Sequence, residues 1–253
     1  MADRPRTVGI LGGMGPAATV DLFHRIVQAT PAHRDQDHLP ILIVNDPSVP
    51  DRSQAILHGG PDPVPRMVEG LQRLARMGAD FAVIPCNTAH HYLPQLRAAV
   101  AIPILDMIQE TVAALARAHP QVRQVGILAT QGTLSVGLYQ QALEAAGRVP
   151  LVPEPAAIRE LMEAIYGPEG IKARGVTPPA RARLQAVGRA LQARGAQALI
   201  LGCTEIPLAL GPGDLPVPLI ASNQALAEAA VREARGGENW PPDQSSWPRS
   251  GVG

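Results

Sequence analysis

The chain has 253 residues, which is enough for one large domain or two small ones. Hydrophobic residues make up 46% of the sequence, a share that suits a globular core and argues against a disordered chain. Basic and acidic residues number 22 each, so no basic excess indicates nucleic-acid or membrane-surface binding, and no apolar run approaches the ~18 residues of a transmembrane helix.

Short apolar runs alternate with helical patterns along the first half of the chain. These patterns predict strands at 7–13, 41–46, 81–86 and 102–106, and helices at 16–30, 62–78, 88–100 and 107–119. Pro16 suits a first helical turn, and Pro94 interrupts or bends the third helix. The stretch NDPSVPDR, residues 45–52, is a predicted proline-rich loop after a strand.

The second half follows the same plan. It predicts strands at 125–130, 151–155, 198–203 and 217–221, helices at 135–147, 156–167, 179–195 and 223–236, and a glycine-rich loop at 167–175. Residues 236–253 have the composition of a flexible end. Alternating strands and helices predict an α/β fold of parallel sheets covered by helices on both sides, in which ligands bind beyond the C-terminal ends of the strands.

The sequence repeats itself at an offset of 117 residues. VGIL occurs twice at this offset, and GADFAVIPCNT, from Gly78, matches GAQALILGCTE, from Gly195. Cys86 and Cys203 are also 117 residues apart. This spacing indicates an internal duplication of about half the chain, too long for a solenoid repeat. We therefore predict two pseudo-symmetric domains with the active site in the cleft between them.

The two cysteines are too few for a disulfide framework, and the charged N-terminus has no long apolar segment typical of a signal peptide, so we expect a cytoplasmic protein. Cys86 and Cys203 each end an apolar run and precede a predicted helix, whose free N–H groups and dipole would stabilise a thiolate. A pseudo-twofold relation between the halves would bring the two sulfurs face to face.

Three chemistries could use such a pair. A redox disulfide lacks its usual C-x-x-C pattern here. Metal binding has only the Cys86–His90 spacing and Glu205 near Cys203 in its favour, without a usual zinc pattern, so we expect no metal. The third chemistry is proton transfer at both faces of one carbon, in which a thiolate removes a proton and an opposed thiol returns one.

Other motifs indicate an anionic ligand. Gly13-x-Gly15-x-x-Ala18 fits a dinucleotide fingerprint only weakly, because the acidic residue expected about twenty positions on is not clearly present, so we expect its N–H groups to bind a small anion instead. Lys172 is the only lysine among 22 basic residues, which favours a specific role for its ammonium, and Arg52 ends a loop that follows a strand.

The motifs GILGGMGP, NDPSVPDR, IPCNTAH, GIKARG and LGCTE, in this order over about residues 7–235, resemble the aspartate racemase group of the aspartate/glutamate racemase superfamily. The resemblance implies racemisation of an acidic amino acid, L-aspartate to D-aspartate and back, by Cys86 and Cys203 as the two acid/bases. It also implies that no cofactor is used, pyridoxal phosphate included, and that the protein is a homodimer. Glutamate racemases differ by an Asp-Ser pair at the first turn and by a histidine where this chain has Glu205.

The resemblance assigns substrate-binding roles as well. The implied set is Met14 and Gly15 through their backbone, Thr130 as the second-half counterpart of that turn, Asn87, Thr88 and Thr204 on the α-carboxylate, and Arg52 and Lys172 on a side-chain carboxylate. One departure is that Asp106 of the first half is matched by Ala221 and Ser222 in the second, which puts any capping role there in doubt.

We expect a first domain at 1–107 plus about 220–235 and a second domain at 108–219. Two alternatives stay open from the sequence. One is a related isomerase or decarboxylase of the same fold that acts on another small carboxylic acid. The other is a catalytically silent protein that binds acidic amino acids. Paired cysteines together with Lys172 argue against the first, and only an assay separates the second.

Overall fold

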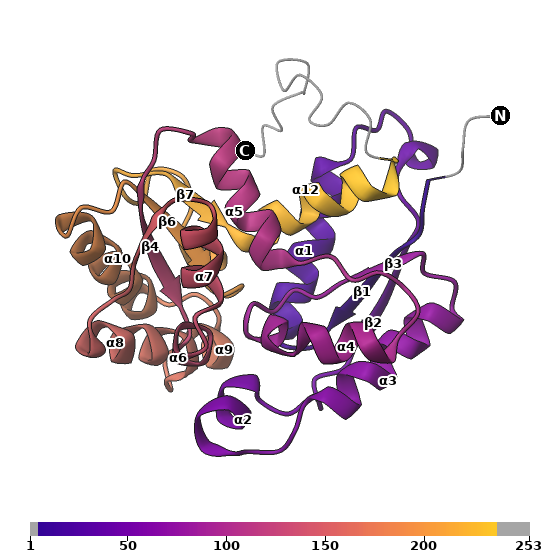
Figure 1. Ribbon diagram of the computed structural model, residues 1–253, viewed down its shortest axis with the longest axis horizontal. Coiled ribbons are helices and arrows are strands. Elements are labelled where there is room, and N and C mark those ends of the chain that lie inside the picture. Colours follow the sequence, from indigo (N-terminus) through magenta and orange to yellow (C-terminus); the bar gives the residue numbers. More distant parts are fainter. Residues whose placement is uncertain (1–4, 237–253) are drawn as a thin grey trace.

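Two parallel β-sheets, one in each half of the chain, organise the computed structural model, which describes residues 5–236 (Figure 1). The first sheet has the order β2-β1-β3 and the second has the order β5-β4-β6-β7. The strands are β1 (Val8–Gly12), β2 (Ile41–Asn45), β3 (Phe81–Val83), β4 (Gln124–Ala129), β5 (Val149–Leu151), β6 (Ala198–Gly202) and β7 (Leu219–Ala221).

The duplication is visible in the strand register. Val8 of β1 pairs with Phe81 of β3, and Val125 of β4 pairs with Ala198 of β6, so each residue of the second pair lies 117 positions beyond its counterpart. The predicted α/β architecture of two similar parallel sheets flanked by helices is therefore confirmed.

Helices cover both faces of each sheet. Those of the first half are α1 (Pro16–Ala29), α2 (Arg52–His58), α3 (Val64–Arg76), α4 (Leu93–Ala99) and α5 (Met107–Ala118), with short 3-10 helices η1 (Asp35–Asp37) and η2 (Thr88–Tyr92). Those of the second half are α6 (Gln131–Ser135), α7 (Leu138–Ala145), α8 (Pro155–Tyr166), α9 (Ile171–Arg174), α10 (Pro178–Ala193), α11 (Ile206–Ala209) and α12 (Ser222–Ala234).

The last helix of each half packs on the sheet of the other half. In α12, Leu226 and Val231 belong to the buried cluster that contains Val8 and Ile10 of β1. In α5, residues 108–115 pack against β4 and β6 instead. The chain thus crosses between the halves near residues 106 and 221, and α12 and α5 lie beside each other between them in Figure 1. This exchange of helices supports the domain limits proposed above, which remain a prediction.

Several predicted boundaries were wrong for identifiable reasons. Strand β3 ends at Val83 rather than 86 because Pro85 has no N–H for the ladder; its counterpart is Gly202, and β6 runs through that residue. The predicted strand at 102–106 is reduced to a single bridge between Ala82 and Ile104, since the shortened β3 offers no further partner.

Three other predictions are also corrected. The predicted helix at 135–147 is interrupted at Gly137, whose φ of 71° is left-handed and starts a new helix, α7. The predicted loop at 45–52 ends in a helix, because the Asp51 side chain accepts a hydrogen bond from the Gln54 N–H and caps α2. The predicted loop at 167–175 contains the single turn α9. The flexible end predicted at 236–253 lies, beyond residue 236, outside the described residues.

Candidate active site

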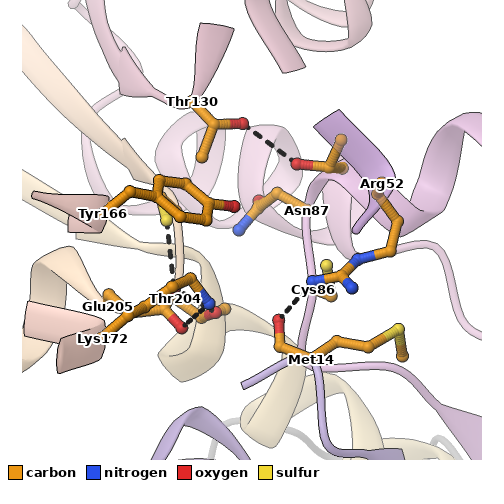
Figure 2. A pocket seen from close by; sticks show the side chains of 11 residues that line it. Met14, Arg52, Cys86, Asn87, Thr130, Tyr166, Lys172, Thr204 and Glu205 are labelled. Atoms are coloured by element: carbon orange, nitrogen blue, oxygen red, sulfur yellow. Dashed lines mark hydrogen bonds and ion pairs between the residues drawn. The ribbon is translucent and has the colours of Figure 1, made fainter. Parts of the chain in front are cut away.

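Cys86 and Cys203 line the same small chamber between the two halves (Figure 2). Cys86 follows β3 and Cys203 follows β6, each beyond the C-terminal end of its strand, and each is only 5% exposed. The chamber measures about 10 Å³, which is room for roughly one water molecule. It is lined by Met14, Arg52, Cys86, Asn87, Thr88, Thr130, Tyr166, Lys172, Cys203, Thr204 and Glu205.

The structure therefore brings together every residue predicted for the site except Gly15. Gly15 borders a neighbouring cavity of about 580 Å³, which shares Met14, Arg52, Lys172 and Glu205 with the chamber. A Cβ atom on Gly15 would lie 3.0 Å from Glu205 Oε1 and 3.3 Å from Lys172 Nζ, so the absence of a side chain lets this charged pair form. Lys172 and Glu205 thus line both the inner chamber and the larger cavity.

Arg52 is the first residue of α2 and is 94% buried, with 6% of its surface exposed. Its guanidinium donates to the carbonyl oxygens of Val49 at 3.3 Å, Pro50 at 2.9 Å and Met14 at 3.1 Å. Its Nε has no partner among the described residues. Burial acts to lower the pKa of Arg52, but the nearby Cys86 and Asp51 raise it overall. Arg52 is thus a fixed cation beside Cys86.

Lys172, Glu205 and Cys203 form a hydrogen-bonded chain on the opposite side (Figure 2). Lys172 Nζ donates to Glu205 Oε1 at 2.7 Å, and the Cys203 thiol donates to Glu205 Oε2 at 3.1 Å. Burial raises the pKa of Cys203 well above its usual value, Glu205 raises it further, and Lys172 opposes both. Burial acts to lower the pKa of Lys172, but Glu205 and Cys203 raise it overall.

The threonines tie the two halves together at the chamber wall. Thr88 Oγ1 lies 3.0 Å from Thr130 Oγ1 and 2.8 Å from Thr133 Oγ1, so hydroxyls from both halves share hydrogen bonds. Thr204 Oγ1 donates to the Pro85 carbonyl oxygen at 3.3 Å. These contacts link residues of the two halves beside the chamber.

The Asn87 side chain is occupied by contacts with the second half. Its Nδ2 donates to Ser222 Oγ at 3.0 Å, and its Oδ1 accepts from Tyr139 OH at 2.5 Å. Ser222 Oγ in turn donates to the Leu201 carbonyl oxygen at 3.0 Å. Ser222 is one of the two residues that the second half has in place of Asp106. It is a buried link between α12, β6 and the segment after β3.

His90 also proves to be structural in its contacts. Its Nδ1 lies 2.9 Å from the Cys86 carbonyl oxygen, and its Nε2 accepts a hydrogen bond from the Met107 N–H at 3.1 Å. Both nitrogens of the ring are therefore occupied. Burial lowers the pKa of His90, so the neutral ring is favoured. Among residues 5–236 there is no group of three or more His, Cys, Asp or Glu side chains placed to hold a metal ion.

Sequence reasoning missed two lining residues, Tyr166 and Glu205. Tyr166 donates to Asp51 Oδ2 at 3.2 Å, and its ring lies 5.4 Å from Lys172 Nζ. Glu205 was noticed only as a departure from the histidine of glutamate racemases and as a weak metal ligand. The signal that could have found it is the repeat, because Glu205 lies 117 residues after Thr88, a residue already predicted for the site.

Comparisons with known proteins point to one family. A family model described as Asp/Glu/Hydantoin racemase matches residues 11–230. The broad specificity amino-acid racemase RacX of Bacillus subtilis is 26% identical over 233 residues, which cover 88% of this chain and 96% of that protein. No helix among the described residues is both long and apolar enough to cross a membrane.

Solved structures share the fold. The aspartate racemase of Picrophilus torridus is 31% identical, with a TM-score of 0.81 over 90% of this chain and 94% of that one. The glutamate racemase isoform RacE1 of Bacillus anthracis is 20% identical, with a TM-score of 0.65 over 93% of this chain and 84% of that one. At that identity the second likeness bears on the fold alone.

Proposed function

Since the chain belongs to the Asp/Glu/hydantoin racemase family, we propose that it interconverts L-aspartate and D-aspartate without a cofactor, with Cys86 and Cys203 as the two acid/bases. One observation carries the proposal: the two cysteines, one from each half, line the same small chamber. A thiolate on one side of a substrate's α-carbon removes the proton, and a thiol on the other side returns one, which inverts the stereocentre.

The chamber offers groups that suit a dicarboxylate. Arg52 and Lys172 supply two cations, and Thr88, Thr130 and Thr204, which carry hydroxyls, line the same chamber. We assign the α-carboxylate to these hydroxyls and to the backbone N–H groups that follow each cysteine, because the Asn87 side chain is already bonded to Ser222 and Tyr139. The second carboxylate then pairs with the cations, which supports aspartate as the substrate.

Lys172 is poorly suited to carry pyridoxal phosphate. A lysine that forms a Schiff base reacts as the neutral amine. Lys172 instead forms an ion pair with Glu205 at 2.7 Å, and its raised pKa favours the ammonium. As it is the only lysine in the sequence, the proposed mechanism relies on the cysteines alone.

Substrate entry requires the chamber to open, because about 10 Å³ cannot hold an amino acid. The adjoining cavity of about 580 Å³ provides the approach, and the Lys172–Glu205 pair stands at the boundary between the two spaces. Closure around the substrate would then exclude water from the reacting carbon.

We also propose a homodimer in a reducing cytoplasm, where two free cysteines stay reduced. The dimer is supported by apolar side chains left exposed in the first half: Val20 (68%) and Phe23 (41%) of α1 and Ile43 (40%) of the edge strand β2. Sedimentation should show a dimer that Phe23→Asp weakens, whereas Val176→Asp, at another exposed apolar position, should leave it intact. A monomeric wild type would refute the dimer.

The test of activity uses purified protein and two measurements. Circular dichroism follows the decay of the optical signal of L-aspartate and of D-aspartate, and proton NMR in D₂O follows exchange of the α-proton. Racemisation predicts loss of optical signal from both enantiomers, with deuterium entering at the α-carbon. Parallel samples with glutamate decide between the two acidic amino acids. Release of carbon dioxide or formation of an isomeric acid would indicate the alternative enzymes, and binding without any exchange would indicate a silent protein.

A further inference from the structure

The two cysteines stand in unequal electrostatic surroundings, although the sequence repeat makes their positions equivalent. Thr88 lies two residues beyond Cys86, and Glu205 lies two residues beyond Cys203. A hydroxyl on one side of the chamber is therefore matched by a buried carboxylate, 3% exposed, on the other. A two-base racemase needs one thiolate and one thiol, so this inequality bears on which cysteine carries the proton.

The contacts of Glu205 fix the direction of its hydrogen bond with Cys203. Glu205 forms an ion pair with Lys172 through Oε1, and an ionised carboxylate only accepts hydrogen bonds. The Cys203 sulfur lies 3.1 Å from Oε2 of the same carboxylate. The proton between these two atoms must therefore belong to the sulfur, since a thiolate at that distance would face a second negative charge with nothing between them.

Cys86 faces a cation. The Arg52 guanidinium is held by the carbonyl oxygens of Val49, Pro50 and Met14, and it approaches Cys86 closely enough for Cys86 to raise the pKa of Arg52 (Figure 2). The structure thus places a backbone-held cation beside Cys86 and a carboxylate beside Cys203.

Other ionisable groups around Cys203 do not cancel the effect of Glu205. They are Lys172 from α9, Tyr166 at the end of α8, Tyr139 from α7, and Cys86 with Arg52 across the chamber. Burial raises the pKa of both tyrosines, so they are neutral phenols at neutral pH. The charge of Lys172 is shared with Glu205, at 2.7 Å from Oε1.

We propose that Glu205 is a positioning residue that keeps the proton on Cys203, so that the free protein carries a thiol at Cys203 and a thiolate at Cys86. The inference rests on the proposed function and deepens it. In the first half-cycle the α C–H bond breaks and its proton forms the S–H bond of Cys86. The Cys203 S–H bond breaks and its proton forms the new C–H bond on the opposite face. Cys203 is left as a thiolate beside Glu205, and the protein returns to its starting form by losing the Cys86 proton to solvent and regaining one at Cys203.

The test is the rate at which iodoacetamide alkylates each cysteine of the full chain without any amino acid present, measured by peptide mass spectrometry between pH 5.5 and 10. Limited access scales each rate by a constant, whereas the midpoint of its pH dependence reports the thiol itself. In the wild type, Cys86 should have the lower midpoint. Glu205→Gln keeps the shape of the side chain and should lower the Cys203 midpoint by about one to three pH units, the effect of one adjacent charge, with a smaller change at Cys86.

Glu169→Gln is the matched control, because Glu169 is an exposed glutamate that pairs with Arg174 near Lys172, and it should leave both midpoints unchanged. Equal midpoints in the wild type, a lower midpoint for Cys203, or an unchanged Cys203 midpoint in Glu205→Gln would each overturn the inference. The wild-type comparison stands even if the variant fails to fold. Because no substrate is used, a protein with split midpoints but no racemisation would refute the proposed function and leave the inference standing.

Discussion

Thr88 and Glu205 occupy equivalent positions in the two halves, yet they make opposite kinds of contact. Thr88 shares hydrogen bonds with the hydroxyls of Thr130 and Thr133 across the boundary between the halves. Glu205 instead accepts hydrogen bonds from Lys172 and Cys203. The duplication thus supplies two matched frames for two cysteines, and one side-chain difference makes the frames chemically unequal.

Replacing either cysteine should abolish racemisation and preserve the fold. Cys86→Ala and Cys203→Ala each remove one acid/base, a loss that typically costs ~10²–10⁴ in rate. The measurement is turnover of both aspartate enantiomers, with urea unfolding as the control for folding. Near-normal turnover in either variant would exclude the two-base mechanism.

Arg52 and Lys172 should set the preference for an acidic side chain. Arg52→Ala and Lys172→Met should lower kcat/KM for aspartate by tens to thousands of fold, since removing one partner of a buried charged pair costs about 2–5 kcal/mol, and should lower it much less for alanine. Arg174→Met is the matched control for Lys172, because Arg174 lies in the same helical turn with its side chain 65% exposed. Equal losses on both substrates would place these residues on the α-carboxylate or in the fold.

The repeat predicted much of this architecture because it records the strand register directly. The offset from Gly78 to Gly195 is also the offset between the paired strands of the two sheets. Contacts between distant segments were less accessible. Lys172 and Glu205 are 33 residues apart, and no local sequence pattern predicts that the Lys172 ammonium contacts the Glu205 carboxylate. Tyr139 and Ser222 likewise meet Asn87 only after the halves exchange their last helices.

The hydrogen bond between Asn87 and Tyr139 should stabilise the protein by linking its halves. Asn87→Ala leaves the buried Tyr139 hydroxyl and Ser222 with fewer partners and should cost about 1–3 kcal/mol for each group left unsatisfied. Tyr139→Phe removes the same hydrogen bond from the other side, and Tyr139 does not line the chamber. A double-mutant cycle by urea unfolding should give a coupling energy of about 0.5–3 kcal/mol. Additive effects would show that the contact contributes nothing measurable.

His90 should make stability depend on pH. Burial lowers the pKa of His90 in the folded protein, so the folded protein favours the neutral ring. The unfolded chain therefore takes up the proton more readily than the folded protein does. This stability is present above the ordinary histidine pKa of about 6.5 and is lost as the pH falls below it. Unfolding free energies from pH 7.5 to 5 should decline less steeply for His90→Gln than for the wild type. The neighbouring His91 is exposed, and His91→Gln should retain the wild-type slope. Parallel slopes for all three proteins would rule out the role of His90.

A methyl group on Gly15 should impair the site without unfolding the protein. Gly15 has φ −112° and ψ 168°, which alanine adopts freely, so Gly15→Ala carries no backbone strain. Its Cβ would lie 3.0 Å from Glu205 Oε1 and 3.3 Å from Lys172 Nζ, and the ion pair would have to shift. Gly13→Ala is the contrasting variant, because φ is 95° there and a Cβ would lie 2.3 Å from the Asp46 carbonyl group, so the fold itself should be destabilised. We expect the free energy of unfolding of Gly15→Ala to stay within about 0.5 kcal/mol of the wild type, as for a substitution without a folding defect. Its kcat/KM for aspartate should fall at least tenfold. Full activity in Gly15→Ala would mean that the geometry of the Lys172–Glu205 pair does not matter for the reaction.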